Sequence, residues 1–223
     1  MENNINSGLG LYRHFYKDFG SDFWGNEPAK IVRIFIEQNY DLSKFKVLDL
    51  GAGTGKNAFA LAKKNAKKII AIEIDSFASL NFLKSLTEME ESGLISEGKI
   101  DLYKCSAVDF LLNNTEQYDC IVAYGLLHVF KTKEEVEKIL FLICEHLLIG
   151  GYLILQSLTN KYPAPISQVE LEGTFITSEY LVDFFREGWE VIYSDQEDIV
   201  HSHLNSDENH RHGSVRLLLK KIR

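Results

Sequence analysis

The stretch from Val47 to Gly55 constrains the fold of this chain more than any other, because an apolar run carrying an acid passes directly into alternating glycines. Val47–Leu50 predicts a buried strand. The three glycines that follow predict a turn in which the main chain lies close to a bound molecule. Lys56–Lys64 then predicts a helix whose free N–H groups face that molecule. The segment therefore predicts a cofactor site.

Two other glycine-rich cofactor motifs fail at specific residues. The dinucleotide fingerprint requires a third glycine where this chain has Lys56, which argues against a nicotinamide-dependent oxidoreductase without removing it as an alternative. A phosphate-binding P-loop requires a glycine in place of Leu50 and a serine or threonine in place of Asn57. The remaining pattern, Asp49-x-Gly51-x-Gly53-x-Gly55, resembles the first motif of the class I S-adenosylmethionine-dependent methyltransferases.

This resemblance implies S-adenosyl-L-methionine as the cofactor and S-adenosyl-L-homocysteine as the product. It also implies an α/β fold, a single-domain Rossmann-like doubly wound sheet of seven strands, the last one antiparallel, with helices on both faces. We expect residues 1–40 to form an amino-terminal helical lid or extension and residues 41–223 to form the methyltransferase core. The Thr132–Glu135 capping box predicts a helix running toward Leu148, and Gly150-Gly151 predicts a turn.

The late part of the chain predicts further elements of this sheet. After the turn we expect a strand over Tyr152–Gln156 and a helix over Ser178–Arg186. A strand over Trp189–Tyr193 and a last strand over Ser214–Lys221 follow, joined by a loop.

The predicted strand over Lys68–Asp75 ends in two acids, Glu73 and Asp75, about twenty residues beyond the glycines. Glu73 occupies the position from which a carboxylate accepts hydrogen bonds from ribose hydroxyls in such folds. We expect Asp75 to cap the helix that begins near Ser76. Glu73 is therefore the predicted ribose acceptor.

The strand over Lys99–Lys104 is followed by Ser106, where the resembling family often carries an acid that accepts from the adenine amino group. A hydroxyl also accepts such a bond, less strongly than a charged group. Adenine recognition then depends more on apolar packing and on the Ala107 backbone N–H. The complete set of predicted cofactor contacts is Asp49, Gly51, Ala52, Gly53, Gly55, Asn57, Glu73, Ile74, Ser106, Ala107 and Tyr124.

The stretch Gln117–His128 resembles the fourth strand of the family and the loop that faces the transferable methyl group. Methyltransferases of exocyclic or amide nitrogens commonly carry Asn-Pro-Pro-Tyr or Asp-Pro-Pro-Tyr there, whereas this chain has Ala123–Leu126. That substrate class is therefore disfavoured. His128 is a candidate catalytic base or substrate contact, with a structural histidine beneath the site as the alternative.

The aromatic segment from Leu11 to Trp24 predicts either a lid over the cofactor or a helix packed on the sheet. Aromatic faces stabilise a sulfonium cation as they stabilise quaternary ammonium groups. Tyr16 and Trp24 are the residues that we expect to serve this role at the substrate side.

Two His-x-His pairs precede the last strand, at residues 201–212. Such pairs present imidazoles for substrate binding or, as an alternative, for a metal ion. A solvated polar loop without a role is the third alternative. This loop, Gly55–Ala58 and Trp189-Glu190 resemble the tellurite-resistance and thiopurine methyltransferase-like branch, in which histidine and arginine near the carboxyl terminus are thought to hold a small chalcogen oxyanion. The residues assigned to catalysis are His128, His201, His203, His210 and Arg211, and those assigned to substrate are Tyr16, Trp24, His212 and Arg216. The alternative metal set is His201, His203, His210 and His212.

Composition favours one cytoplasmic domain and a small-molecule methyl acceptor. The 223 residues include 45% hydrophobic side chains, enough for a substantial core. The formal net charge of −8 disfavours nucleic acid and anionic membranes as partners. The three cysteines lack metal-ligand spacing, which indicates reduced thiols, and no export signal or spanning segment is expected. A non-catalytic protein that binds S-adenosylmethionine or a metal remains an alternative.

Overall fold

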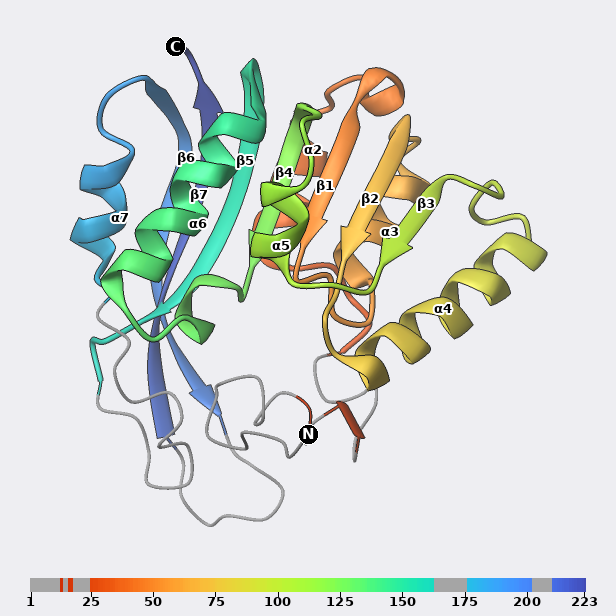
Figure 1. Ribbon diagram of the computed structural model, residues 1–223, viewed down its shortest axis with the longest axis horizontal. Coiled ribbons are helices and arrows are strands. Elements are labelled where there is room, and N and C mark those ends of the chain that lie inside the picture. The colour runs from red at the N-terminus through yellow and green to blue at the C-terminus, as the bar shows by residue number, and fades with distance from the viewer. Residues whose placement is uncertain (1–12, 14–15, 18–24, 163–175, 202–209) are drawn as a thin grey trace.

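The computed structural model describes residues 13, 16–17, 25–162, 176–201 and 210–223. Its centre is a seven-stranded sheet in the order β3-β2-β1-β4-β5-β7-β6 (Figure 1). β7 runs antiparallel to both β5 and β6, whereas the pairs among β1 to β5 are parallel. The predicted doubly wound sheet with an antiparallel last strand is confirmed.

The strands and helices alternate along the chain as this topology requires. The strands are β1 (Lys46–Leu50), β2 (Lys68–Ile72), β3 (Ile100–Tyr103), β4 (Tyr118–Tyr124), β5 (Leu147–Thr159), β6 (Trp189–His201) and β7 (His210–Lys221). The helices are α2 (Lys30–Glu37), α3 (Lys56–Lys63), α4 (Ser76–Glu91), α5 (Ala107–Leu112), α6 (Lys133–His146) and α7 (Ser178–Phe184), with 3₁₀ turns η2 (Leu42–Lys44) and η3 (Leu127–Val129).

Alternate residues of the central strands enter two separate hydrophobic cores, because side chains of a strand point to opposite faces of the sheet. Val47 of β1 packs in the core that α2, α3 and α4 cover, and Leu48 packs in the core beneath α5, α6 and α7. Phe35 of α2 is fully buried against Tyr152 of β5, with ring centroids 5.4 Å apart. Helices therefore cover both faces (Figure 1).

β1 is the strand at which the winding of the sheet reverses, since β2 and β3 lie on one side of it and β4 and β5 on the other. Ligands of such sheets bind beyond the carboxyl ends of the strands at this reversal. The glycine turn after Leu50 and the end of β4 at Tyr124 both lie at this edge, which places the candidate site there.

Three sequence predictions need correction. β6 and β7 are much longer than expected, so Arg211 and His212 lie in a strand and not in a loop. β5 begins at Leu147, and Gly150-Gly151 lies within this strand, beside a register irregularity in its pairing with β4. α7 ends at Phe184, two residues earlier than expected. Extended antiparallel pairing and a bulge, both set by strand neighbours, are invisible to local sequence patterns.

Candidate active site

The turn between β1 and α3 requires glycine at two of its positions. Gly53 has φ +57° and Gly55 has φ +96°, a region that residues with a Cβ atom rarely adopt. A Cβ atom at Gly55 would stand 2.6 Å from the ring of Phe59, and one at Gly53 would stand 2.8 Å from the hydroxyl of Tyr16. Gly55 also precedes the first residue of α3. The glycines therefore leave the backbone of the turn without side chains over it, and the free N–H groups at the start of α3 follow directly.

Glu73 connects this turn to the end of β2. One carboxylate oxygen accepts from the Gly53 backbone N–H at 2.7 Å, and the other accepts from the Asp75 N–H at 2.7 Å. Burial raises the pKa of Glu73, and these two backbone hydrogen bonds oppose that shift. Each oxygen still has capacity for a second hydrogen bond. Glu73 therefore fixes the turn and keeps acceptors for hydroxyl groups of a ligand.

Asp49 is the buried acid of β1, only 1% exposed. Its Oδ2 atom has no hydrogen-bond partner among the described residues. Burial, together with the neighbouring charge of Glu73, raises its pKa to about 7. A buried carboxyl oxygen without a partner is costly, and a cationic group of a ligand would compensate that cost. Asp49 and Glu73 thus form an acidic floor beneath the glycine turn.

Asp75 caps α4, as predicted, because its Oδ1 accepts from the backbone N–H groups of Phe77 and Ala78 at 2.8 and 3.0 Å. Its other oxygen pairs with Arg13 Nε at 3.2 Å. Together with the position of Tyr16 at the glycine turn, this ion pair places Arg13 and Tyr16 at the cofactor side of the sheet. Trp24, the other aromatic residue assigned to this role, lies outside the described residues.

Other predicted cofactor contacts have visible structural roles. Ser106 caps α5, since its hydroxyl accepts from the Asp109 N–H at 3.0 Å, and Ala107 is the first residue of that helix. The Asn57 side-chain oxygen accepts from the Ala29 N–H at 2.9 Å, which connects α3 to the start of α2. Gly51 and Ala52 donate their N–H groups to the Ile72 carbonyl, and Ile74 is 43% exposed.

The end of β4 brings a lysine and an aromatic ring together. Lys56 Nζ lies 5.7 Å from the centroid of the Tyr124 ring, within cation–π range, and burial lowers the pKa of this lysine. Burial also raises the pKa of Tyr124, while the charges of Arg216 and Glu197 act on it in opposite directions. Tyr124 therefore lies between the cofactor turn and the charged side chains of β6 and β7.

His128 is a buried, neutral imidazole. Its Nδ1 accepts from the Leu158 backbone N–H at 3.3 Å, so its Nε2 carries the proton. Burial, with smaller contributions from His212 and Lys131, lowers its pKa to about 3. A Cβ atom at Gly125 would stand 3.9 Å from the His128 ring, so this ring lies just beyond β4. With its acceptor nitrogen engaged and its pKa low, His128 is suited to donating a hydrogen bond and not to removing a proton.

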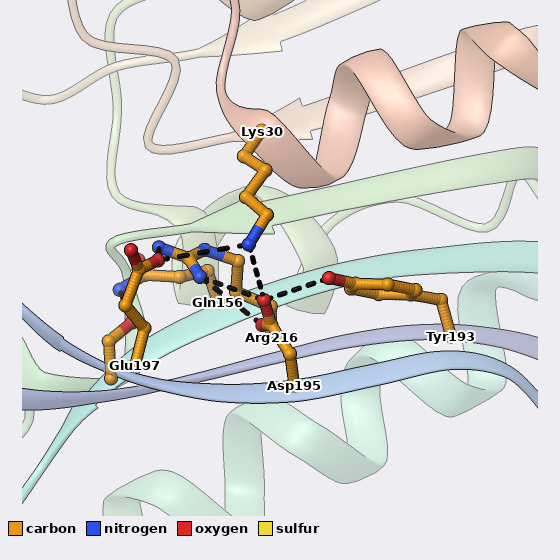
Figure 2. A network of polar contacts seen from close by, with 7 residues as sticks. Lys30, Gln156, Tyr193, Asp195, Glu197 and Arg216 are labelled. Carbon is orange, nitrogen blue, oxygen red and sulfur yellow. Dashed lines mark hydrogen bonds and ion pairs between the residues drawn. The ribbon is translucent and has the colours of Figure 1, made fainter.

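Arg216 of β7 stands at the centre of a charged cluster, and its side chain is only 8% exposed (Figure 2). Its Nη1 lies 3.2 Å from Asp195 Oδ2, and its Nη2 lies 2.5 Å from Glu197 Oε2. Lys30 of α2 reaches the same Asp195 oxygen at 2.8 Å. Burial acts to raise the pKa of Asp195, but hydrogen bonds from Lys30 and Tyr193 hold it below its ordinary value.

Among the described residues, the side chains of the histidine-rich segment do not converge on a single binding site. Arg211 is exposed and Arg216 is buried, and strand alternation sends these two residues to opposite faces of β7. His212 is buried near His128. His203 and the side chains of His201 and His210 lie outside the description. No group of three or more metal-ligating side chains occurs among the described residues.

The charged partners of Arg216 were not predicted from the sequence, although the residues around Arg216 indicate that it needs them. Arg216 interrupts an apolar strand in which Val215 and Leu217–Leu219 are all buried. An arginine in such a strand needs buried partners. Asp195 and Glu197, spaced by two in the neighbouring strand, share one face and fit that requirement. Lys30 is 165 residues from Asp195 in the chain, and no sequence pattern indicates that pairing.

Comparison with known families agrees with this geometry. The model of the tellurite resistance protein TehB family matches residues 30–218, which includes the glycine turn, Glu73 and the β6–β7 cluster. The chain belongs to the TehB family. The branch of methyltransferases that the sequence motifs resemble is thereby confirmed.

The individual relatives are named as methyltransferases. The probable S-adenosyl-L-methionine-dependent methyltransferase TehB of Haemophilus influenzae is 29% identical over 175 residues, 75% of this chain and 53% of that protein. Protein arginine N-methyltransferase 6 of Danio rerio is 34% identical over 133 residues, 57% of this chain and 34% of that protein. The chain thus spans about half or less of the length of these curated relatives.

Solved structures share the fold. The crystal structure of TehB from Haemophilus influenzae superposes with a TM-score of 0.66 at 19% identity, covering 94% of this chain and 66% of that chain. N-methyltransferase NodS from Bradyrhizobium japonicum, in complex with S-adenosyl-L-homocysteine, gives a TM-score of 0.65 at 13% identity, with 97% and 100% coverage. In the described part of the TehB-family chain, no helix is long and apolar enough to cross a membrane.

Proposed function

We propose that this TehB-family chain is an S-adenosyl-L-methionine-dependent methyltransferase that acts on a small anionic nucleophile, with a chalcogen oxyanion such as tellurite or selenite as the first candidate. The observation that carries the proposal is the acidic floor beneath the glycine turn. Asp49 presents a buried carboxyl oxygen without a described partner, and Glu73 keeps acceptors free. This pair fits a ligand that carries an ammonium group and a ribose.

The bound cofactor would supply a methyl group already activated on a sulfonium sulfur. In the transfer, a lone pair of the acceptor forms a bond to the methyl carbon, while the carbon–sulfur bond breaks and its electrons stay on sulfur. The protein contributes mainly alignment and exclusion of water. Among the described residues, Tyr16 at the glycine turn and Tyr124 at the end of β4 are placed for this task.

The state of His128 supports an acceptor that needs no general base. Its Nδ1 is engaged by the Leu158 N–H, and its pKa of about 3 gives it little basicity at neutral pH. A lone pair on sulfur, selenium or tellurium attacks without prior loss of a proton. Nitrogen or oxygen acceptors that must first lose a proton would need a base elsewhere in the site.

The overall charge supports a small acceptor and not a nucleic acid, because a net charge of −8 opposes a phosphate-rich polymer. We include in the proposal a cytoplasmic location, which agrees with the three free cysteines. Residues 1–40 remain proposed as a lid or extension, although α2 within them is packed in the core.

Two successive measurements test this function. Isothermal titration calorimetry with S-adenosyl-L-homocysteine should show binding in folded protein, and Glu73→Ala should weaken it. Formation of S-adenosyl-L-homocysteine from S-adenosyl-L-methionine should then depend on added tellurite or selenite. Absence of cofactor binding would refute the methyltransferase function, whereas cofactor binding without turnover on these oxyanions would refute only the acceptor class.

A further inference from the structure

The pairing of Arg216 is incomplete in a specific way. Its Nη1 lies 3.2 Å from both oxygens of Asp195, and its Nη2 contacts one oxygen of Glu197. The third nitrogen, Nε, is buried and has no hydrogen-bond partner among the described residues. A buried donor of a charged group is seldom left without an acceptor. The guanidinium therefore carries unused binding capacity.

The unused nitrogen lies on the edge that guanidinium groups use for bidentate binding. The Nε–H and one Nη2–H point in the same direction and match the spacing of two oxygens in a carboxylate or a trigonal oxyanion. Glu197 engages Nη2 through a single oxygen, so it fills only half of this edge. An anion that offered two oxygens would satisfy both donors.

The two acids around Arg216 differ in how firmly they are held. Asp195 also accepts from Lys30 Nζ and from the Tyr193 hydroxyl, each at 2.8 Å, and its side chain is 20% exposed (Figure 2). Glu197 is 48% exposed, and its second cation, Lys30, is 3.9 Å away. Asp195 is thus a fixed partner of Arg216, and Glu197 is a replaceable one.

The replaceable pair lies on the acceptor side of the cofactor turn. Arg216 is directly opposite Gln156 of β5 in the sheet register. Gln156 in turn lies beside Gly125, because a Cβ atom there would stand 4.0 Å from its side-chain oxygen. Gly125 immediately follows β4, whose end faces the cofactor turn. The charges of Arg216 and Glu197 also reach Tyr124 at that end.

Arg216 is one of the residues that the family resemblance assigns to the methyl acceptor. We propose that Glu197 is an internal competitor at the Nε/Nη2 edge of Arg216, and that it must leave this edge before an anionic acceptor binds there. The proposal rests on the proposed function and names the specificity element within it. The formal charges of the cluster cancel, because Lys30 and Arg216 are cations and Asp195 and Glu197 are anions. Departure of Glu197 therefore leaves one net positive charge for the incoming anion. An anion with two oxygens engages both donors of this edge, whereas an anion with a single acceptor atom engages only one of them well.

The test measures anion binding by calorimetry with selenite and with propanoate, both with two or more oxygens, and with chloride as a single-atom anion. Glu197→Gln keeps the shape of the side chain and removes its charge, and we expect it to tighten selenite and propanoate about tenfold, the effect of one charge-assisted hydrogen bond. Glu190→Gln, an exposed acid of the same strand, is the matched control and should change binding less than about twofold. Chloride should gain less from Glu197→Gln than either selenite or propanoate, because a single atom cannot engage both donors of the edge in line.

Arg216→Lys separates the guanidinium edge from charge alone. In the Glu197→Gln/Arg216→Lys double variant, we expect the gain to disappear, because an ammonium group lacks the bidentate edge. An equal gain in the double variant, or no gain in Glu197→Gln, would overturn the proposal. If Arg216→Lys reduces folding, the comparison of the two glutamate variants still decides, because neither removes the arginine.

Titrations are run on the protein alone and on the protein loaded with S-adenosyl-L-homocysteine. Failure of the loading step would count against the methyltransferase function, while the anion titrations of the unloaded protein would still test Glu197. Selectivity between selenite and propanoate distinguishes a chalcogen oxyanion from a carboxylate as the acceptor group.

Discussion

The two halves of the candidate site are built in different ways. In the cofactor half, the glycine turn, Glu73 and Asp75 come from one stretch of chain, and their contacts are mostly between side chains and nearby backbone. In the acceptor half, Arg216 is held by side chains from β6, and Lys30 of α2 joins them from a distant part of the chain. Figure 2 shows Lys30 reaching the Asp195 and Arg216 side chains from a separate element.

This difference indicates which half of the site tolerates substitution of its residues. Backbone N–H groups are the same in every sequence, so a turn that binds through them depends on a few glycines and acids. A cluster of paired charges depends on every partner, because each removal leaves another charge buried without compensation. We therefore expect the cofactor half to determine whether the cofactor binds, and the acceptor half to determine what is methylated.

Glu73→Ala should give the largest effect on the cofactor half. Loss of the carboxylate removes charge-assisted hydrogen bonds to the turn and to the ligand, about 4 kcal/mol or about a thousandfold in Kd for S-adenosyl-L-homocysteine. Asp75→Ala removes a helix cap, which costs about 1 kcal/mol of unfolding free energy and should change Kd less than about threefold. Calorimetry and thermal unfolding measure the two quantities, and equal losses of affinity would contradict the assignment of the two acids.

Asp49 should make cofactor binding depend on pH. Its pKa of about 7 lies above the ordinary value of 3.8, so the folded protein without ligand loses stability as pH rises from about 4 to 7. A ligand ammonium group prefers the ionised carboxylate, so affinity should rise up to about a hundredfold from pH 5 to 7 and then level off. Asp49→Asn should flatten both curves. A wild-type affinity that is constant over this range would exclude Asp49 as the ammonium partner.

Asp195→Asn should affect the acceptor half and spare the cofactor half. Removal of this charge weakens the contacts of Arg216 and Lys30 and should cost about 2 kcal/mol of unfolding free energy. Denaturant unfolding measures this loss, and hydrogen exchange should locate the change in β6 and β7. The Kd for S-adenosyl-L-homocysteine should stay within about twofold of wild type, and a large change would show that the two halves are energetically coupled.

Asn57→Ala should give the smallest effect and decides between two roles for this residue. Its oxygen accepts from the Ala29 N–H, so its removal leaves that buried donor unpaired at a cost of about 1 kcal/mol in unfolding free energy. If Asn57 serves only this connection, the Kd for S-adenosyl-L-homocysteine changes less than about threefold. A tenfold loss with unchanged stability would favour the direct cofactor contact expected from the sequence.

Local patterns predicted the parts of the molecule whose physics is local. The strand over Val47–Leu50, the capping box at Thr132 and the Asp75 cap follow from hydrophobic periodicity and capping, and the doubly wound sheet follows from the family resemblance. The structure confirms all four. Glu73 was expected at the end of the second strand as the ribose acceptor, and that role stays a prediction. Its hydrogen bond from the Gly53 N–H was not predicted.

The sequence by itself determined the fold class, the cofactor turn and the family, since these depend on residues close together in the chain. Only the tertiary structure decided which charges meet, because the pairing of Lys30 with Asp195 and the half-filled edge of Arg216 arise from the register of β6 against β7 and from the packing of α2. Register and helix placement are set by the burial of the whole sheet, which no short segment encodes.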